Sequence, residues 1–261
     1  MSRIEARFTQ LRAAGRTGLV TYVTAGDPDM ARSAEIIKRL DQAGADVLEI
    51  GVPFSDPLAD GPVIQRATER ALAAGATLDG VLDMLGKLRA EVSAPIVIFS
   101  YANPILRMGL ETFVSKARAA GVDGVLTLDM PPEEGGLFRA AFAAAGIDTI
   151  FLLSPTTTVE RIRRAAELGS GFLYGISRLG VTGVRDNVDA SAHELATRVR
   201  AHTAMPLALG FGISRPEHVR AIGASADAAV VGSALVNVIA EHGQAPDLLD
   251  EVERYVRWLR N

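Results

Sequence analysis

Short apolar runs alternate with amphipathic stretches along the whole chain. In segment 32–43, for example, Ile36, Leu40 and Ala43 recur at helical spacing and face one side. The apolar runs predict eight strands, at 18–25, 46–52, 95–101, 124–129, 148–153, 171–176, 206–210 and 227–231. Near-continuous apolar strands separated by helices indicate a parallel α/β sheet that is covered on both faces.

Both an open doubly wound sheet and a closed eight-stranded barrel fit this alternation. The strands form one uninterrupted series within 261 residues, and no dinucleotide-binding glycine fingerprint follows the first strand, so the pattern favours a (β/α)8 TIM barrel. No linker or low-complexity stretch interrupts the chain, so we expect a single domain over 1–261 with an extra N-terminal helix. Active sites of such barrels lie at the carboxyl ends of the strands.

Some helix starts are marked by capping-box spacing, in which a Ser or Thr and a Glu three residues later bond each other's backbone N–H groups. Three such pairs occur: Thr157 with Glu160, Ser191 with Glu194, and Ser214 with Glu217. They predict helices that begin directly after these Ser and Thr residues.

The composition excludes several classes of protein. Hydrophobic residues make up 48% and charged residues 22%, as is typical of a globular chain with a substantial core. The absence of cysteine excludes disulfides, thiolate catalysis and cysteine-ligated metals, and the four histidines form no metal-binding pair. A net charge of −4 without a basic stretch argues against nucleic acid and membrane surfaces. Because neither a membrane-spanning segment nor a signal peptide is apparent, we expect a soluble, cytoplasmic protein that acts on a small molecule.

The segment 46–61, DVLEIGVPFSDPLADG, places a carboxylate inside a predicted strand. Alternation puts Glu49 on the side opposite to Leu48 and Ile50, which suit the layer between strands and helices, so Glu49 should point into the barrel. A buried, unpaired carboxylate is costly unless its pKa rises. A core Lys or Arg could neutralise it, but the predicted strands contain neither, which favours a functional role.

Asp56 and Asp60 follow in the loop directly after this strand. Each could be a turn-former beside proline or glycine, or part of a metal site, although the loop lacks histidine and an ordered ligand spacing. At the carboxyl end of a strand, a loop carboxylate and Glu49 could also act on one substrate as two acid/base groups with different pKa values.

Glycine-rich turns follow the last three predicted strands: GVTG at 180–183, GFGIS at 210–214 and GSA at 232–234. Ordinary turns use glycine, but glycine also lets backbone N–H groups approach an anion closely. The N–H groups of Gly232 and Ser233 would open the last barrel helix, whose dipole favours negative charge. Because loops after the seventh and eighth strands often bind phosphate in this fold, we expect a phosphate site there.

Three of the four tyrosines, Tyr22, Tyr101 and Tyr174, lie on predicted strands, and Leu126 lies on another. They could be ordinary core residues whose hydroxyls are satisfied locally. They could also form an aromatic, apolar pocket at the strand ends, next to the turn YANPI at 101–105.

The segments LEIGVPFSDPLADGPVIQ, YANP, DMPPEE, GVTG, GFGIS and GSA occur in an order and spacing that resemble the tryptophan synthase alpha chain family over essentially the whole sequence. The resemblance implies a (β/α)8 barrel that cleaves indole-3-glycerol phosphate to indole and glyceraldehyde 3-phosphate, a retro-aldol reaction of tryptophan biosynthesis. It implies no metal and no cofactor in this chain. Indole would pass to a beta chain that carries pyridoxal phosphate, in an alpha2beta2 tetramer.

By the same resemblance, Glu49 and Asp60 are the catalytic pair. Asp60 would take up the charge that develops at the indole N–H, and Glu49 would exchange protons with the ring carbon and the side-chain hydroxyl. The other implied positions fall into three groups: Tyr22, Tyr101, Leu126, Tyr174 and Thr182 for the indole pocket; Gly183, Phe211, Gly212, Gly232 and Ser233 for the phosphate; Asp56, Pro57, Asn103 and Pro104 for the beta chain contact.

The resemblance also implies that segment 177–190 is a mobile loop that closes over the substrate, with Thr182 meeting Asp60. Two positions depart from the family pattern. Tyr22 stands in place of a phenylalanine, and Gly175 stands in place of a bulky residue.

Two other functions fit parts of the sequence. A phosphosugar isomerase or an indole-glycerol-phosphate synthase on the same barrel would share the phosphate end but needs another catalytic set, such as a strand-end lysine, which the predicted strands lack. A subunit that chiefly activates a beta partner would fit the loop motifs. The presence of both Glu49 and Asp60 argues against a purely regulatory role.

Overall fold

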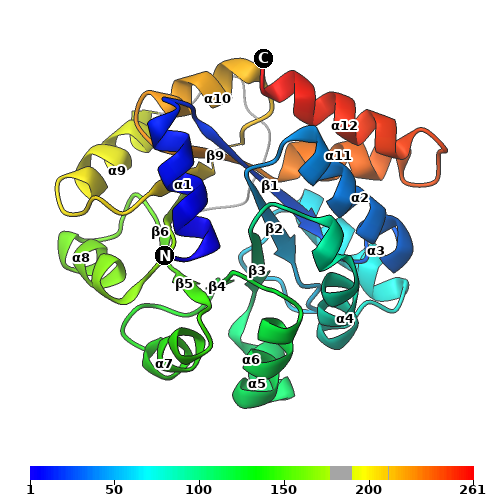
Figure 1. The fold of residues 1–261 in the computed structure, drawn as a ribbon, viewed down its shortest axis with the longest axis horizontal. Coiled ribbons are helices and arrows are strands. Elements are labelled where there is room, and N and C mark those ends of the chain that lie inside the picture. Colours follow the sequence, from blue (N-terminus) through cyan, green and yellow to red (C-terminus); the bar gives the residue numbers. More distant parts are fainter. Residues whose placement is uncertain (177–189, 211) are drawn as a thin grey trace.

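The structure is a computed structural model of the chain, and it describes residues 1–176, 190–210 and 212–261. Its strands are β1 (Gly18–Thr24), β2 (Val47–Gly51), β3 (Ile96–Ser100), β4 (Gly124–Thr127), β5 (Asp148–Ile150), β6 (Leu152–Leu153), β7 (Leu173–Ile176), β8 (Leu207–Gly210) and β9 (Ala228–Val231). They pair in parallel in the order β5-β4-β3-β2-β1-β9-β8-β7-β6. Only Phe151 separates β5 from β6, so both ends of this order belong to one stretch of chain and the sheet closes into the predicted barrel (Figure 1).

Helices surround the barrel in a ring, and one more helix lies across its centre (Figure 1). The helices are α1 (Arg3–Ala13), α2 (Met30–Ala43), α3 (Pro62–Ala73), α4 (Leu78–Leu88), α5 (Ala102–Met108), α6 (Leu110–Ala119), α7 (Gly136–Ala144), α8 (Val159–Leu168), α9 (Ala190–Arg200), α10 (Pro216–Gly223), α11 (Ser233–His242) and α12 (Leu248–Leu259), with a 3-10 turn η1 (Arg89–Glu91) after α4. Within the described residues, no helix combines the length and the apolar character needed to cross a membrane.

Strand alternation divides the apolar residues into two cores. Leu48 and Ile50 of β2 belong to the large core between the strands and the helices, whereas Val47 belongs to the core inside the barrel. The helix α2 buries Ile36 and Leu40 in the outer core, as their spacing predicts. Inward positions at the carboxyl ends of the strands are therefore the positions from which side chains can reach a ligand.

The extra N-terminal helix, α1, closes the amino end of the barrel. It starts with a capping box, in which Ser2 and Glu5 each accept a hydrogen bond from the other's backbone N–H. Its buried face carries Ile4 and Phe8 into the inner core, where the Phe8 ring lies 5.4 Å from that of Phe172 between centroids. The helix thus acts as an apolar plug beneath the strands.

Charged residues on α1 tie this plug to the residues that precede three different strands. The ion pairs are Arg3 Nε to Asp123 Oδ1 at 3.7 Å, Arg7 Nη1 to Asp46 Oδ1 at 3.9 Å, and Arg12 Nε to Asp227 Oδ1 at 2.7 Å. The amino end of the barrel is occupied by these contacts, so a ligand site must lie at the opposite, carboxyl end of the strands.

The three predicted capping boxes are wrong in detail. The N-cap of α8 is Thr158, one residue later than predicted. The Thr157 hydroxyl instead accepts a hydrogen bond from the Ser154 N–H in the preceding turn. Helix α9 begins before Ser191, which therefore lies inside it. The N-cap of α10 is Arg215 rather than Ser214, and a proline fills the first helical position.

Candidate active site

Glu49 lies on β2 inside the barrel, where its Cα is opposite those of Tyr22 on β1 and Val97 on β3. The side chain is 0% exposed, and neither carboxyl oxygen has a hydrogen-bond partner among the described residues. Burial raises the pKa of Glu49 to about 8. The glutamate is thus not a core residue neutralised by a Lys or Arg, and its carboxyl is largely protonated at pH 7.

Asp60 is the second buried carboxyl at this end of the barrel. It lies in the loop between β2 and α3 and is 8% exposed. The Tyr101 hydroxyl donates a hydrogen bond to its Oδ2 atom at 3.1 Å, and the Ala59 N–H donates to the Tyr101 oxygen at 3.0 Å. Burial raises the pKa of Asp60 to about 6, against the opposing effect of the Tyr101 hydrogen bond. At pH 7 Asp60 is therefore largely ionised, so the two carboxyls differ in charge.

The start of α3 holds the backbone that carries Asp60. Gly61 is the N-cap of this helix, and Pro62 occupies its first position, which suits the fixed φ of proline. The Gln65 side-chain amide donates to the Asp60 carbonyl oxygen at 2.8 Å, and the Asp60 N–H donates to the Pro57 carbonyl oxygen at 3.1 Å. These bonds fix the loop on both sides of the carboxylate.

An aromatic and apolar wall lines the same end of the barrel. Tyr22, Tyr101, Leu126 and Tyr174 are all buried, and the last two belong to the inner core. Burial raises the pKa of Tyr22 and of Tyr174 well above the usual value for tyrosine, so both hydroxyls stay protonated. The structure thus brings four of the five predicted pocket residues together, and Thr182 lies outside the described residues.

Glycines at the strand ends leave room for two of these rings. A Cβ added to Gly51 would lie 2.2 Å from the Tyr22 hydroxyl oxygen, and one added to Gly210 would lie 2.9 Å from the Tyr174 hydroxyl oxygen. Any larger residue at either position would displace a tyrosine. A Cβ on Gly175 would instead meet leucine side chains of the outer core, so this departure from the family pattern concerns helix packing rather than the pocket.

Four further residues complete the wall, although the sequence did not single them out. They are partly buried side chains that pack on the inner core: Phe99, Leu128, Leu152 and Ile176. The signal that could have identified them was strand parity, because each lies two residues after an inward-facing residue of the same predicted strand.

The start of α11 forms the candidate phosphate site. Gly232 is the N-cap, no side chain caps the helix, and Ser233 is its first residue, so N–H groups of the first turn remain available to an anion. Gly212, in the neighbouring loop, has a φ of 66°, a conformation that glycine adopts easily. The two other predicted phosphate positions, Gly183 and Phe211, lie outside the described residues.

The predicted partner contacts lie at the same end of the barrel, Asp56 and Pro57 on the loop between β2 and α3, and Asn103 and Pro104 on the short helix α5. Asp56 and Asn103 are exposed, whereas Pro57 and Pro104 are half-buried. The sequence did not identify Leu58 on the same loop, which is 94% exposed, or Leu106 on α5, which is 56% exposed. Exposed apolar side chains beside the predicted contact positions are compatible with a protein contact at this surface.

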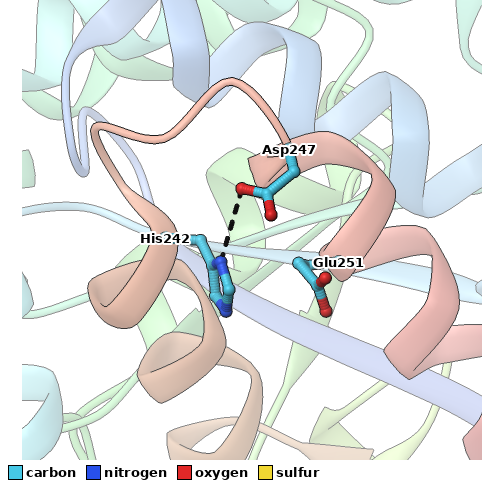
Figure 2. Close-up of side chains that lie close together, drawn as sticks. All are labelled: His242, Asp247 and Glu251. Carbon is cyan, nitrogen blue, oxygen red and sulfur yellow. Dashed lines mark ion pairs between the residues drawn. The ribbon is translucent and has the colours of Figure 1, made fainter.

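One group of potential metal ligands occurs among the described residues, on the outer helices. His242 at the end of α11 and Asp247 and Glu251 at the start of α12 bring one ligand atom each within 4.8 Å of the others (Figure 2). Each acidic member already has a partner, since Asp247 lies 3.5 Å from the His242 ring nitrogen and Glu251 pairs with Arg254. No such group includes the loop carboxylates Asp56 and Asp60 in the part of the chain that the structure describes.

The fold and the site define a (β/α)8-barrel enzyme with two buried carboxyls at the strand ends and an open helix N-terminus beside them. A family model described as "Tryptophan synthase alpha chain" matches residues 8–259. The chain therefore belongs to the tryptophan synthase alpha chain family, whose function is the lyase reaction that cleaves indole-3-glycerol phosphate to indole and glyceraldehyde 3-phosphate in tryptophan biosynthesis.

Individual relatives agree with this assignment. The tryptophan synthase alpha chain of Geobacter sulfurreducens is 49% identical over 260 residues, covering 100% of this chain and 98% of the relative. That of Polynucleobacter asymbioticus is 46% identical, with 98% of each chain covered.

Solved structures confirm the predicted barrel. A structure of Mycobacterium tuberculosis tryptophan synthase matches with a TM-score of 0.92 and 35% identity, over 99% of this chain and 97% of that chain. The tryptophan synthase subunit alpha of Legionella pneumophila matches with a TM-score of 0.90 and 37% identity, over 100% and 97%.

Proposed function

We propose that Glu49 and Asp60 perform the family reaction in this chain as its acid/base pair. The observation that carries this proposal is the buried Glu49 carboxyl, which has no partner among the described residues and a pKa of about 8. A second buried carboxyl, Asp60, lies at the same strand ends with a pKa of about 6. Cleavage of indole-3-glycerol phosphate moves protons at separate atoms, so two groups of different pKa suit it.

The proposed reaction starts with proton transfer to the ring. Asp60, ionised, accepts a hydrogen bond from the indole N–H and stabilises the positive charge that develops on the ring nitrogen. Glu49, protonated, delivers its proton to ring carbon C3, and the nitrogen lone pair supplies the electrons that convert the ring to an indolenine. The ring can now accept the electron pair of the bond to its side chain.

Bond cleavage follows as the second step. The Glu49 carboxylate removes the proton from the hydroxyl on the carbon attached to C3. The carbon–carbon bond breaks, the hydroxyl-bearing carbon becomes the aldehyde of glyceraldehyde 3-phosphate, and the released electron pair restores the aromatic indole. Glu49 ends protonated and Asp60 ends ionised, so both groups are ready for another turnover.

The remaining residues bind the two ends of the substrate in this proposal. The wall formed by Tyr22, Tyr101, Leu126 and Tyr174 encloses the indole ring, because these buried side chains surround the carboxyls. The N–H groups at the start of α11 bind the phosphate. Positions assigned by sequence to the same roles are Thr182 for the indole pocket, and Gly183, Phe211 and Gly212, with Gly232 and Ser233, for the phosphate.

A tryptophan synthase beta chain is the proposed partner. It carries pyridoxal phosphate and receives indole, in an alpha2beta2 tetramer, while the acid and base of the alpha reaction are side chains of this chain and need no cofactor. The predicted contact residues are Asp56, Pro57, Asn103 and Pro104. Support comes from the exposure of Leu58 on the loop after β2 and of Leu106 on α5.

An indole-release assay tests the function. The purified chain is mixed with indole-3-glycerol phosphate, alone and with a tryptophan synthase beta chain, and indole is quantified after separation of products. We expect indole from the chain alone and faster release with the partner. Release only in the presence of the partner would favour the regulatory alternative, and no release in either case would contradict the proposed function.

A further inference from the structure

The turn that follows β8 carries one half of the proposed phosphate site. Gly210, the last residue of β8, pairs with Val230 of β9, and the two parallel strands lead on to Gly212 and Gly232, respectively. Because each glycine follows its paired residue by the same distance along the chain, Gly212 should lie beside Gly232. The 212–214 turn therefore lies next to the start of α11, where the N–H groups of the first helical turn are available to an anion.

Ser214 ends this turn, but its own side chain does not hold the turn in place. The Ser214 Oγ atom is buried and has no hydrogen-bond partner among the described residues. The following residue, Arg215, is the N-cap of α10, and its side chain makes no capping hydrogen bond. A serine cap, which would normally fix the entry of the chain into such a helix, is thus missing here. Groups from other elements have to fix the backbone of the turn.

Two side chains from different helices bind the backbone of Ser214. The Ser214 N–H donates a hydrogen bond to Nδ1 of His218 at 3.3 Å, and the Tyr255 hydroxyl donates one to the Ser214 carbonyl oxygen at 3.1 Å. His218 lies on α10 and is 6% exposed, whereas Tyr255 lies on α12 and is half-buried. Because burial limits competition from water, these hydrogen bonds hold the turn more firmly than exposed ones would.

Helix α12 also contacts the other half of the proposed phosphate site. It lies beside α11, and Val252 and Val256 of α12 belong to the same outer core as Leu235 and Ile239 of α11 (Figure 1). The hydroxyl of Tyr255 reaches from this helix to the turn after β8. One helix is thus connected both to the 212–214 turn and to the helix whose N-terminus would bind the phosphate.

We infer that Tyr255 and His218 are positioning residues for the substrate phosphate: they hold the backbone of Ser214 and so fix Gly212 beside the start of α11. The inference rests on the proposed function and identifies side chains that set the geometry of its phosphate end. A site made of backbone N–H groups binds an anion well only where several of these groups converge on it. A turn that is free to shift would weaken this convergence.

Tyr255→Phe tests the inference because it keeps the ring and removes the hydroxyl that donates to Ser214. Binding is followed by NMR titration with two probes, glycerol 3-phosphate for the phosphate end and indole for the other end. We expect the dissociation constant for glycerol 3-phosphate to rise about fivefold, because one partly buried hydrogen bond is lost. The dissociation constant for indole should change by less than about twofold.

Steady-state kinetics of Tyr255→Phe provide a second readout. The phosphate is bound in both the ground state and the transition state, so its weaker binding should raise KM and leave kcat nearly unchanged. We expect KM for indole-3-glycerol phosphate to rise about fivefold, with kcat within about twofold of wild type. Circular dichroism and thermal unfolding establish that each variant used here is folded.

His218→Asn and His218→Leu form a matched pair for the second hydrogen bond. Both remove the imidazole, but asparagine keeps an acceptor oxygen close to the position of Nδ1, whereas leucine has no acceptor. The difference between the two variants therefore reports the hydrogen bond from the Ser214 N–H. We expect His218→Leu to bind glycerol 3-phosphate about fivefold more weakly than His218→Asn does, with similar affinities for indole.

Trp258→Phe is the control for a disturbance of α12. The Trp258 ring packs on that of Tyr255, with centroids 5.8 Å apart, and it is 44% exposed. This substitution changes a neighbour of Tyr255 and leaves its hydroxyl in place. We expect dissociation constants close to those of wild type for both probes.

Four results would overturn the inference. The first is a folded Tyr255→Phe protein with wild-type affinity for glycerol 3-phosphate. The second is an equal loss of affinity for indole and glycerol 3-phosphate, or the same loss in Trp258→Phe, since general loosening would then explain it. The third is equal affinity in His218→Asn and His218→Leu, and the fourth is a wild-type chain that does not bind glycerol 3-phosphate. Failure of the proposed function is distinct, because the wild-type chain would then form no indole, whereas the binding measurements need no turnover.

Discussion

Glu49 illustrates what can and cannot be derived from a single residue in a sequence. Strand alternation and the lack of Lys or Arg in the strands were enough to predict its inward orientation, which the structure bears out with a fully buried side chain. The raised pKa could not be derived, because it depends on every group that does or does not approach the carboxyl in three dimensions. The position of Phe99 in the wall could not be derived either, because it depends on packing against the ring of Tyr22.

The raised pKa of Glu49 links the stability of the protein to pH. The usual pKa of this carboxyl is 4.5, and in the folded protein it is about 8. Between these values the folded state binds more protons than the unfolded state, so the free energy of unfolding falls as the pH rises from 4.5 to 8. Glu49→Gln replaces the carboxyl with an amide that does not titrate, so the variant does not lose this stability as the pH rises. From pH 4 to pH 9 we expect the variant to gain stability relative to wild type by up to about 4 kcal/mol.

Urea unfolding of both proteins across this pH range measures the effect. Glu111→Gln, at an exposed position of α6, serves as the control and should track the wild type at every pH. A stability difference between Glu49→Gln and wild type that is constant with pH would show that the carboxyl is not held protonated in the folded state.

At the scale of elements, periodicity was a better guide than capping patterns. All eight predicted strands are present, because apolar runs in this chain are buried between two cores. The break at Phe151 within 148–153 was not predictable from composition, since residues 150–153 are all apolar. The capping boxes failed by one residue at α8 and α10, where a local turn at Thr157 and a proline after Arg215 set the helix start.

Because α1 closes the amino end of the barrel with buried side chains, substitutions on its buried face should lower the free energy of unfolding. Phe8 is buried and packs on Phe172, so Phe8→Ala should lower the free energy of unfolding by about 3–5 kcal/mol. Gln10→Ala, at an exposed position of the same helix, should change it by less than about 0.5 kcal/mol. Denaturant titration measures both. A loss below about 1 kcal/mol for Phe8→Ala would mean that α1 is not part of the cooperative core.

For the molecule as a whole, the sequence patterns predicted the barrel but not which apolar side chains are exposed on its surface. Exposure of Leu58 and Leu106 depends on how the loop after β2 and the helix α5 are packed, and an apolar residue looks the same in a sequence whether it is exposed or buried. The single domain over 1–261 stays a prediction, as do the contacts assigned to Asp56, Pro57, Asn103 and Pro104.

The exposed Leu106 on α5 gives a prediction about assembly. Leu106→Asp should weaken binding of a beta chain about tenfold or more, because a charge replaces an apolar contact, and should leave indole formation by the isolated chain within about twofold. Trp258→Ala, on α12 away from α5 in Figure 1, is the control and should bind the partner normally. Calorimetric titration gives both affinities. Equal affinity of wild type and Leu106→Asp would place the contact elsewhere.

In the proposed mechanism two buried carboxyls with different pKa values carry out the cleavage, and the turnover rates of Glu49→Gln and Asp60→Asn are its sharpest test. Both changes are nearly isosteric, so thermal unfolding near pH 5 should show folded proteins. With indole-3-glycerol phosphate at saturation, each variant is expected to form indole about 100-fold more slowly than wild type, or slower still. Turnover close to the wild-type rate in either folded variant would show that the carboxyl it lacks is not part of the acid/base pair.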